Sequence, residues 1–288
     1  MNVARTPGEL THEPRAVALG TFDGVHLGHR RVIEAALAAG PRATVVTFDP
    51  HPRIALGNQV ELLTTLERRL ELFEELGVAD TLVIEFTPET ARLEPEEFVD
   101  TVLRPIGAEV IVAGENFRFG RARSGDLDLL SVLGFDVRPV PLVENVSSSQ
   151  LRKLLRAGEI ERGAVFLGRP PEVEGTVVSG DARGGTLGFP TANLSVDPQL
   201  LVPAYGIYAG AVGENRAAIS IGTNPHYGGD ERRIEVFVLD FEGDLYGRRL
   251  VVQLWKRLRD ERAFASEKEL IDQIAHDVEQ TRSARRPV

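Results

Sequence analysis

The segment from Gly20 to His29 constrains the fold most, because its three glycines and two histidines join an apolar run, 16–19, to a helical pattern that begins at Val32. A strand, a glycine-rich turn and a helix start can form a phosphate-binding site. Glycine lets the backbone approach an anion, and the first helical N–H groups point at it. His26 and His29 are three residues apart, so both rings can lie on one face of the helix. The alternative is an ordinary turn followed by a helix with incidental histidines.

Strand and helix patterns alternate through the first half of the chain. The predicted strands are 16–19, 44–48, 81–86, 110–113 and 137–140, and the predicted helices are 30–39, 66–76, 96–103 and 127–133. Thr64 and Glu67 form a predicted capping box for the second of these helices. The alternation predicts a parallel sheet covered on both faces, with ligands bound outside the carboxyl ends of the strands. Polar loops at 20–29, 47–52 and 114–120 follow three strands, which predicts a site at one rim.

A run of serines, Ser147 to Ser149, opens a further predicted helix that reaches about Ala157. These serines can act simply as a helix cap, and a cap is all that one interpretation requires. Their position after the last strand of the α/β half favours a role in the same site. A short helix over 161–167 ends at Gly168, where we predict the domain boundary.

Beyond Pro171 the pattern changes to short strands separated by turns. The predicted strands are 174–178, 206–212, 217–221, 234–241 and 250–258. Such spacing is typical of an antiparallel barrel or sandwich. A final amphipathic helix over 266–281 begins with a capping box from Ser266 to Glu269. Its stripe of Leu270, Ile271 and Ile274 predicts that it covers the barrel as part of the core.

Two motifs of the second half carry chemical side chains. In Gly184–Asn193 the strand period places Thr191 and Asn193 on one side, where a hydroxyl and an amide oxygen suit Mg²⁺ that also binds nucleotide phosphates. A loop shaped by glycine and proline is the alternative. In 234–240 the alternation places Glu235 on a face with apolar side chains, which tends to raise a carboxyl pKa and suits a general base. On a solvent-facing side it would be ordinary surface.

Composition excludes several classes of site. The 288 residues contain no cysteine, so disulfides, thiolate metal sites and thiol nucleophiles are excluded. The lysines are Lys153, Lys256 and Lys268, and none lies in a glycine-rich turn, which excludes a P-loop. ATP, if bound, must therefore be held by histidine, arginine, backbone and metal. A net charge of −10 argues against a broad nucleic-acid surface. Because neither a membrane span nor a signal peptide is evident, we expect no membrane association and a cytoplasmic location.

Taken together, the motifs resemble the prokaryotic bifunctional riboflavin kinase/FMN adenylyltransferase family, the FAD synthetases. The adenylyltransferase half is matched by G-T-F-D-G-V-H-L-G-H, T-F-D-P-H-P, G-E-N-F-R-F-G and S-S-S-Q-L-R. The kinase half is matched by L-G-F-P-T-A-N-L, Y-G-I-Y-A-G, I-G-T-N-P, I-E-V-F-V-L-D-F, D-L-Y-G and L-R-D-E-R-A-F. The resemblance runs from about Arg15 to Thr281. It implies an α/β Rossmann-like nucleotidyltransferase domain of the HIGH type over 1–168. An antiparallel six-stranded β-barrel flavokinase domain with a C-terminal helix would follow over 169–288.

The resemblance also implies the activity and its residues. Riboflavin and ATP would give FMN, and FMN with a second ATP would give FAD and pyrophosphate, with Mg²⁺ or another divalent cation. The implied catalytic residues are His26, His29 and Glu235. The implied nucleotide-binding residues are Gly20, Phe22, Gly24, Asn116, Ser148, Ser149, Arg152, Gly180, Gly188 and Pro190. The implied flavin-binding residues are Asn224, Arg259, Glu261 and Phe264, and the implied metal ligands are Thr191 and Asn193. The oligomeric state stays open, a homo-oligomer included.

Four positions depart from the family pattern: Gly185 stands in place of an arginine, Pro171 of a tyrosine, and His226 and Ser149 of threonines. Gly185 bears on a phosphate contact and keeps two alternatives in view. One is a flavin-binding protein whose kinase half is impaired, and the other is a monofunctional adenylyltransferase. A tRNA-synthetase-like role, suggested by the histidine motif alone, fits poorly with a short acidic chain.

Overall fold

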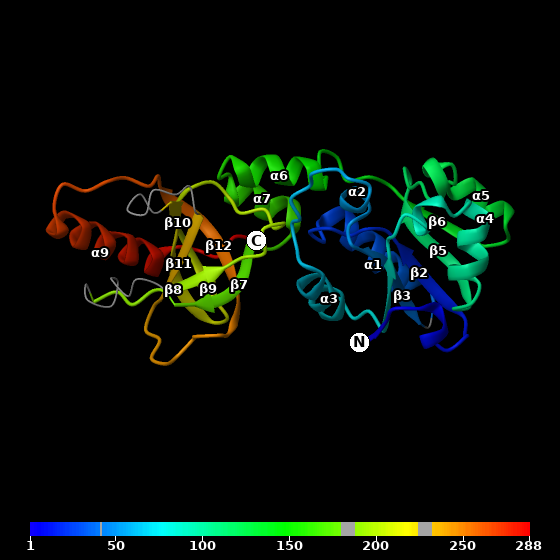
Figure 1. Ribbon diagram of the computed structural model, residues 1–288, viewed down its shortest axis with the longest axis horizontal. Helices are drawn as coiled ribbons and strands as arrows, with labels where there is room; N and C mark the ends of the chain where they lie inside the picture. The colour runs from blue at the N-terminus through cyan, green and yellow to red at the C-terminus, as the bar shows by residue number, and fades with distance from the viewer. Residues whose placement is uncertain (41, 180–187, 224–231) are drawn as a thin grey trace. The chain divides into compact units, whose positions relative to one another are not determined.

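The computed structural model describes the chain except residues 41, 180–187 and 224–231. It divides into two compact units, Met1–Ser148 and Ser149–Val288, which are described separately below (Figure 1). The predicted assignment of 1–168 and 169–288 to the two activities stays a prediction, because the division between compact units falls earlier. The division falls earlier because the helices after Ser148 pack on the barrel, where the Ala204 N–H donates to the Leu155 carbonyl at 3.1 Å.

The first unit contains a six-stranded parallel sheet in the order β1-β4-β3-β2-β5-β6. Its strands are β1 Asn2–Ala4, β2 Arg15–Leu19, β3 Ala43–Asp49, β4 Asp80–Glu85, β5 Ala108–Gly114 and β6 Asp136–Val140. The five predicted strands are confirmed. The sequence pattern missed β1, whose three residues are too few to show a period and which pairs in parallel with β4.

Helices α1 Leu27–Ala39, α2 Pro52–Ala55, α3 Leu66–Glu75, α4 Pro95–Phe98 and α5 Leu127–Val132 connect these strands, with short helical turns η1 Pro7–Glu9, η2 Thr90–Arg92, η3 Val99–Leu103 and η4 Arg121–Arg123. The predicted helix over 96–103 is present, but its second part, η3, has π-helical geometry. The predicted start at Arg30 was three residues late, because α1 begins directly at the end of the glycine-rich turn.

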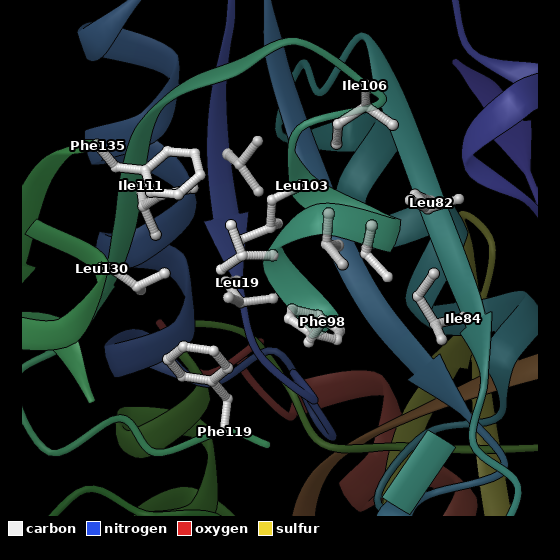
Figure 2. Close-up of a cluster of buried hydrophobic side chains, with 14 of the residues drawn as sticks. Leu19, Leu82, Ile84, Phe98, Leu103, Ile106, Ile111, Phe119, Leu130 and Phe135 are labelled. Carbon is white, nitrogen blue, oxygen red and sulfur yellow. The ribbon is translucent and has the colours of Figure 1, made fainter. Parts of the chain in front are cut away.

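The sheet buries a hydrophobic core on each face, because side chains alternate along every strand. On one face Leu19 and Ile111 pack against Phe98, Leu103 and other side chains from α4, η3 and α5 (Figure 2). On the other, side chains of α1 and α3 cover the alternate strand positions, such as Ala18 and Val45. Burying each large apolar side chain contributes roughly 1.5–3 kcal/mol to stability. The prediction of a sheet covered on both faces is confirmed.

The second unit is a closed antiparallel barrel in the order β10-β11-β8-β7-β12-β9. Its strands are β7 Glu172–Val178, β8 Ala192–Ser195, β9 Gly206–Val212, β10 Asn215–Thr223, β11 Arg232–Val238 and β12 Arg249–Arg259, and its helices are α6 Ser148–Arg156, α7 Ile160–Leu167 and α9 Glu267–Ser283. The six-stranded barrel that the resemblance implied is confirmed. Its interior holds neighbouring pairs such as Ile219 and Val236, both 1% exposed.

Helix α9 corrects one prediction. Leu270, Ile271 and Ile274 are only half-buried, and the fully covered residues of the helix are Asp277 and Thr281. The C-terminal end of α9 is tied to β10, because Arg216 donates to the Thr281 carbonyl at 3.0 Å. The helix does lie against β9 and β10 as predicted, but its apolar stripe is only partly covered and is therefore not core.

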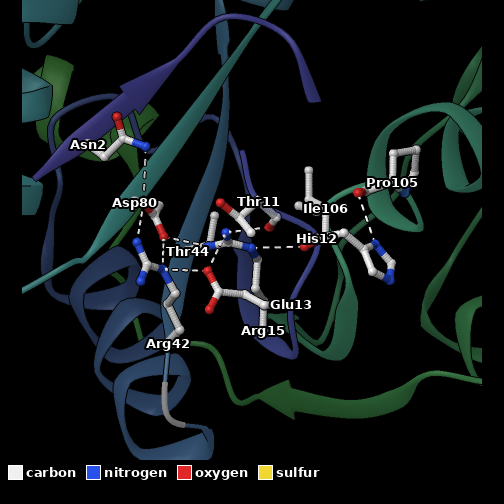
Figure 3. Close-up of polar contacts among 10 residues, drawn as sticks. All are labelled: Asn2, Thr11, His12, Glu13, Arg15, Arg42, Thr44, Asp80, Pro105 and Ile106. Carbon is white, nitrogen blue, oxygen red and sulfur yellow. Dashed lines mark hydrogen bonds and ion pairs between the residues drawn. The ribbon is translucent and has the colours of Figure 1, made fainter. Parts of the chain in front are cut away.

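At the amino ends of the strands, buried charges hold the parallel sheet together (Figure 3). The Asp80 carboxylate accepts hydrogen bonds from Arg15 and Arg42, and the Arg15 guanidinium also donates to Thr44 Oγ1 at 3.0 Å and to the Ile106 carbonyl at 2.9 Å. These bonds tie β2, β3 and β4 together and reach the segment before β5. Burial by itself would raise the pKa of Asp80, but hydrogen bonds from Arg42 and Arg15, and their charges, outweigh it and hold that pKa below its usual range.

We expect Arg15→Met to lower the free energy of unfolding by about 1.5–3 kcal/mol, because the buried Asp80 carboxylate loses the hydrogen bond from Arg15 and keeps only Arg42. The lowered pKa of Asp80 stabilises the fold above the pKa of an unfolded aspartate, about 3.9, and this contribution is lost as the pH falls through the lower folded value. Urea denaturation between pH 3 and 7 measures both effects. Equal stability of wild type and Asp80→Asn across this range would contradict the assignment.

Candidate active sites

The turn between β2 and α1 has an unusual backbone. Phe22, Gly24 and Val25 all have positive φ values, of 56°, 84° and 40°. Such conformations cost about 1–3 kcal/mol each for residues other than glycine, so surrounding contacts must hold them. A Cβ on Gly24 would lie 2.8 Å from Leu63 Cδ1, so glycine is required there for space as well.

The segment just before α3 is one of the contacts that hold the turn. Asp23 Oδ1 accepts hydrogen bonds from the N–H groups of Leu63 and Thr64, at 2.9 and 3.2 Å. Thr64 Oγ1 in turn accepts the Gly24 N–H at 3.1 Å. The predicted helix cap at Thr64 is therefore wrong: Thr65 caps α3 by accepting the Arg68 N–H at 3.1 Å, and Thr64 binds the turn instead.

Side chains from other elements donate hydrogen bonds to two carbonyls of the turn. The Thr21 carbonyl accepts from Thr47 Oγ1 at 3.0 Å and from Arg69 Nη1 at 2.7 Å. The Asp23 carbonyl accepts from Ser148 Oγ at 3.1 Å, which brings a predicted nucleotide-binding serine to the turn. Because these carbonyls accept hydrogen bonds from the protein, the part of the turn that can attract an anion is the start of α1. The N-terminal end of a helix carries partial positive charge and favours an anion.

The two histidines lie together at the start of α1. Their rings stack with centroids 3.6 Å apart and an interplanar angle of 17°. His26 caps the helix, and its Nδ1 accepts the His29 N–H at 3.4 Å, so in this arrangement the neutral ring carries its proton on Nε2. The edge-on ring of Phe22, 5.4 Å from His29, supports the pair. The three-residue spacing placed both rings on one face, as the structure has them.

The remaining predicted residues of this site lie on several elements. Asn116 is exposed just past the end of β5, the strand next to β2, and therefore lies at the same edge of the sheet. Gly20 directly follows β2, with the Phe22 ring against it. Ser149 and Arg152 belong to α6 in the second unit, where Ser149 is exposed and Arg152 is buried.

In the second unit, strand register assembles a row of side chains around the barrel. Consecutive cross-strand partners in this row are Val178, Asn193, Glu235, Ser220, Ile207 and Arg259. Directly paired residues have Cβ atoms roughly 4.5–5.5 Å apart, so Asn193 and Ser220 flank Glu235 at close range. These three are half-buried, whereas the alternate positions fill the barrel interior. The row therefore lies on the outer face.

The segment before β8 contributes the predicted metal ligand Thr191 and covers the face that carries Glu235. Phe189 meets Phe237 edge-on with ring centroids 5.6 Å apart, and Phe237 is two residues from Glu235. Gly188 has a φ of 85°, and Pro190 follows Phe189. Among the described residues, no group of three or more histidine, cysteine or acidic side chains could hold a metal. A hydroxyl and an amide oxygen fit Mg²⁺ only where phosphate and water oxygens complete its shell.

Of the predicted flavin-binding residues, Arg259 is the last residue of β12, and Glu261 and Phe264 follow it. Arg259 donates through Nη2 to the buried Asp277 carboxylate at 2.7 Å, and its guanidinium is 5.8 Å from the Phe264 ring. The Glu261 carboxylate lies against Gly222, where a Cβ would overlap it. An open pocket beside α9 includes Phe264 and Arg262. Gly180 and Asn224, like Gly185 and His226, lie outside the described residues.

Sequence reasoning missed four residues that the structure places at these sites: Asp23, Thr64, Arg69 and Ser220. Asp23 lies inside the glycine motif, and its carboxylate was a signal that could have been weighed. Thr64 and Thr65 are adjacent and chemically identical, so no pattern separates their roles. Arg69 and Ser220 reach their sites only through packing and strand register.

Family models match both halves of the chain. The FAD synthetase model matches residues 9–150 and the riboflavin kinase model matches residues 167–285. A bifunctional riboflavin kinase/FMN adenylyltransferase of Listeria monocytogenes is 36% identical over 96% of this chain and 95% of its own. Those of Bacillus subtilis and Escherichia coli K12 are 35% and 34% identical, covering 94% and 96% of this chain and 93% and 96% of their own.

The chain belongs to the bifunctional riboflavin kinase/FMN adenylyltransferase family. The FAD synthetase model ends in α6 and the riboflavin kinase model begins at the end of α7, so the two helices mostly lie between the matches. A solved structure described as a macrolide-efflux protein from Streptococcus pneumoniae is also similar to this chain. It is 31% identical with a TM-score of 0.86, covering 98% of this chain and 99% of its own. Over the described residues, no helix has both the length and the apolar character that crossing a membrane requires.

We expect Thr64→Val to lower the free energy of unfolding by about 1–2 kcal/mol and to speed hydrogen exchange of the Gly24 amide, because that N–H loses its acceptor. Thr65→Val is the matched control: it costs about 1 kcal/mol through the helix cap and speeds exchange at Arg68 instead. Urea denaturation and amide exchange by NMR measure both. Unchanged Gly24 exchange in Thr64→Val would show that the turn does not depend on this hydroxyl.

Proposed function

We infer that this chain is a bifunctional enzyme that phosphorylates riboflavin to FMN and then adenylylates FMN to FAD, using ATP in both steps. The observation that carries this conclusion is the match of both halves, in order, to the FAD synthetase and riboflavin kinase families. Relatives that carry both activities in their names align over nearly the whole chain. The two alternatives, a flavin-binding protein with an impaired kinase half and a monofunctional adenylyltransferase, leave one matched half without a role.

In adenylyl transfer, an oxygen of the FMN phosphate attacks the α-phosphorus of ATP. The bond between that phosphorus and the bridging oxygen breaks, and pyrophosphate leaves. The protein supplies positioning and charge stabilisation, so no protein nucleophile is needed. We assign the ATP phosphates to His26, His29 and the first N–H groups of α1. The turn residues Gly20, Phe22 and Gly24, together with Asn116, Ser148, Ser149 and Arg152, would complete the nucleotide site.

In the kinase step, we assign Glu235 as the base that takes the proton of the riboflavin 5′-hydroxyl. The hydroxyl oxygen then bonds to the γ-phosphorus, and the bond from that phosphorus to ADP breaks. Thr191 and Asn193 would hold Mg²⁺ together with the phosphates, and the bound ion would neutralise the charge that develops on them. The pairing of Glu235 with Asn193 across β11 and β8 supports this arrangement, since the base and a metal ligand are neighbours.

The remaining contacts are assigned from the resemblance to the family motifs. We assign flavin contacts to Arg259, Glu261, Phe264 and Asn224, and nucleotide contacts in the kinase site to Gly180, Gly188 and Pro190. We assign the enzyme to the cytoplasm, with riboflavin, FMN and ATP as its ligands and no nucleic-acid partner. The direct test of this function incubates purified protein with riboflavin, ATP and Mg²⁺ and separates the flavins by chromatography. FMN should appear first and FAD later, and formation of neither would overturn the function.

We expect His29→Ala to reduce FAD formation about a hundredfold or more while FMN accumulates, because the adenylylation transition state loses a charge-stabilising group. The same chromatographic assay measures both products. The matched control is His12→Ala. This exposed histidine contacts the Pro105 carbonyl and is not part of the turn. Loss of FMN formation in His29→Ala would contradict the assignment of this histidine to the adenylylation site alone.

We expect Glu235→Gln to slow FMN formation from riboflavin by about 10²–10⁴-fold, because an amide cannot accept the hydroxyl proton. FAD formation from supplied FMN should stay at the wild-type rate. Glu242→Gln, at an exposed position just after β11, serves as the control. If Glu235→Gln abolished both activities, or neither, the placement of the kinase base would be wrong.

A further inference from the structure

We propose that Arg69 is a positioning residue for adenylyl transfer: it fixes the β2–α1 turn and neutralises the carboxylates beneath the bound ATP phosphates. This rests on the proposed function, because it takes the turn to be the ATP site. Arg69 does not touch the substrate, since its side chain is only 4% exposed. It acts through the turn and through its charge.

The geometry of Arg69 directs it at the turn. It lies on α3, and its Nη1 donates to the Thr21 carbonyl at 2.7 Å, one residue before the left-handed backbone of Phe22. Thr47 donates to the same carbonyl, so that oxygen is held from two sides. With Asp23 bound to the residues before α3, the turn is held at two of its residues, Thr21 and Asp23, ahead of the start of α1.

Two acidic residues explain why a cation is placed here. Asp49 Oδ1 lies 3.9 Å from Arg69 Nη2, and the buried Asp23 also interacts with Arg69 electrostatically. Both residues lie at the carboxyl edge of the sheet, where an ATP polyphosphate would meet their negative charge. Arg69 is a buried cation that interacts with both of them. Its own charge is therefore needed for the site to accept an anion.

The cost of this placement argues against a purely structural role. Arg69 Nε is buried without a hydrogen-bond partner among the residues that the structure describes, and an unsatisfied buried donor is unfavourable. Burial lowers the pKa of Arg69, and Asp23 and Asp49 act in the opposite direction. A leucine or methionine would fill the same space without this penalty, so packing alone does not account for the guanidinium.

The test measures FAD formation from FMN at varied ATP in Arg69→Gln, Arg69→Lys and the double variant Arg69→Gln/Asp49→Asn. We expect Arg69→Gln to raise the KM for ATP about tenfold and to lower kcat, because a buried charge partner is lost. Removing Asp49's charge in the double variant should recover about threefold or more of the KM, since neighbouring charges couple. Arg69→Lys should fall between wild type and Arg69→Gln. It is also the fallback if Arg69→Gln does not fold.

The controls separate the possible failures. Arg68→Gln removes the neighbouring arginine, which pairs with Glu71 and Glu75, and should leave adenylylation kinetics within about twofold of wild type. FMN formation from riboflavin should be unaffected in every variant. Wild-type KM in Arg69→Gln, or no recovery in the double variant, would overturn the proposal while leaving the function intact. Absence of FAD formation by the wild-type enzyme would overturn the function itself.

Discussion

Strand register is the constraint on which both sites depend. In the first unit the parallel alignment of β2, β3 and β5 brings the ends of all three strands to one edge. The turn from Gly20, Asp49 and Asn116 therefore meet at one rim. In the second unit the antiparallel register of the closed barrel places Glu235 between Asn193 and Ser220. A shift of β11 by one residue would move Glu235 to the opposite face and separate it from Asn193 and Ser220.

The two ends of the parallel sheet differ in how their charged side chains are paired. At the amino ends, Arg15 and Arg42 both donate hydrogen bonds to Asp80 (Figure 3). At the carboxyl ends, Arg69 faces Asp23 and Asp49 around a turn with strained backbone and keeps one donor unsatisfied. The first arrangement stabilises the fold, and the second is the one that we propose serves an anionic ligand. Strain and unsatisfied polar groups commonly gather at functional sites for this reason.

The barrel reaches its site by another route. Glu235, the proposed base, and Asn193, a proposed metal ligand, lie on adjacent strands of the barrel, so strand pairing fixes their separation. Residues before β8 and after β12 then add groups around this fixed row. The edge-on contact of Phe189 with Phe237 holds the segment that carries Thr191 close to the row. A half-buried face of this kind can exclude part of the solvent from a phosphoryl transfer.

The sequence by itself determined the alternation of strands and helices, the change to short strands after Pro171 and the chemistry of the main motifs. These signals are local, because glycine turns, helix periods and strand alternation are written in neighbouring residues. It also placed His26 and His29 on one helix face, whereas the common orientation of Thr191 and Asn193 stays a prediction because β8 begins only at Ala192. Only the tertiary structure decided that Thr64 binds the turn while Thr65 caps α3, because two adjacent threonines give the same local signal. Likewise, Arg69 and Ser220 acquire their places from packing and register between segments distant in the chain, which no local pattern records.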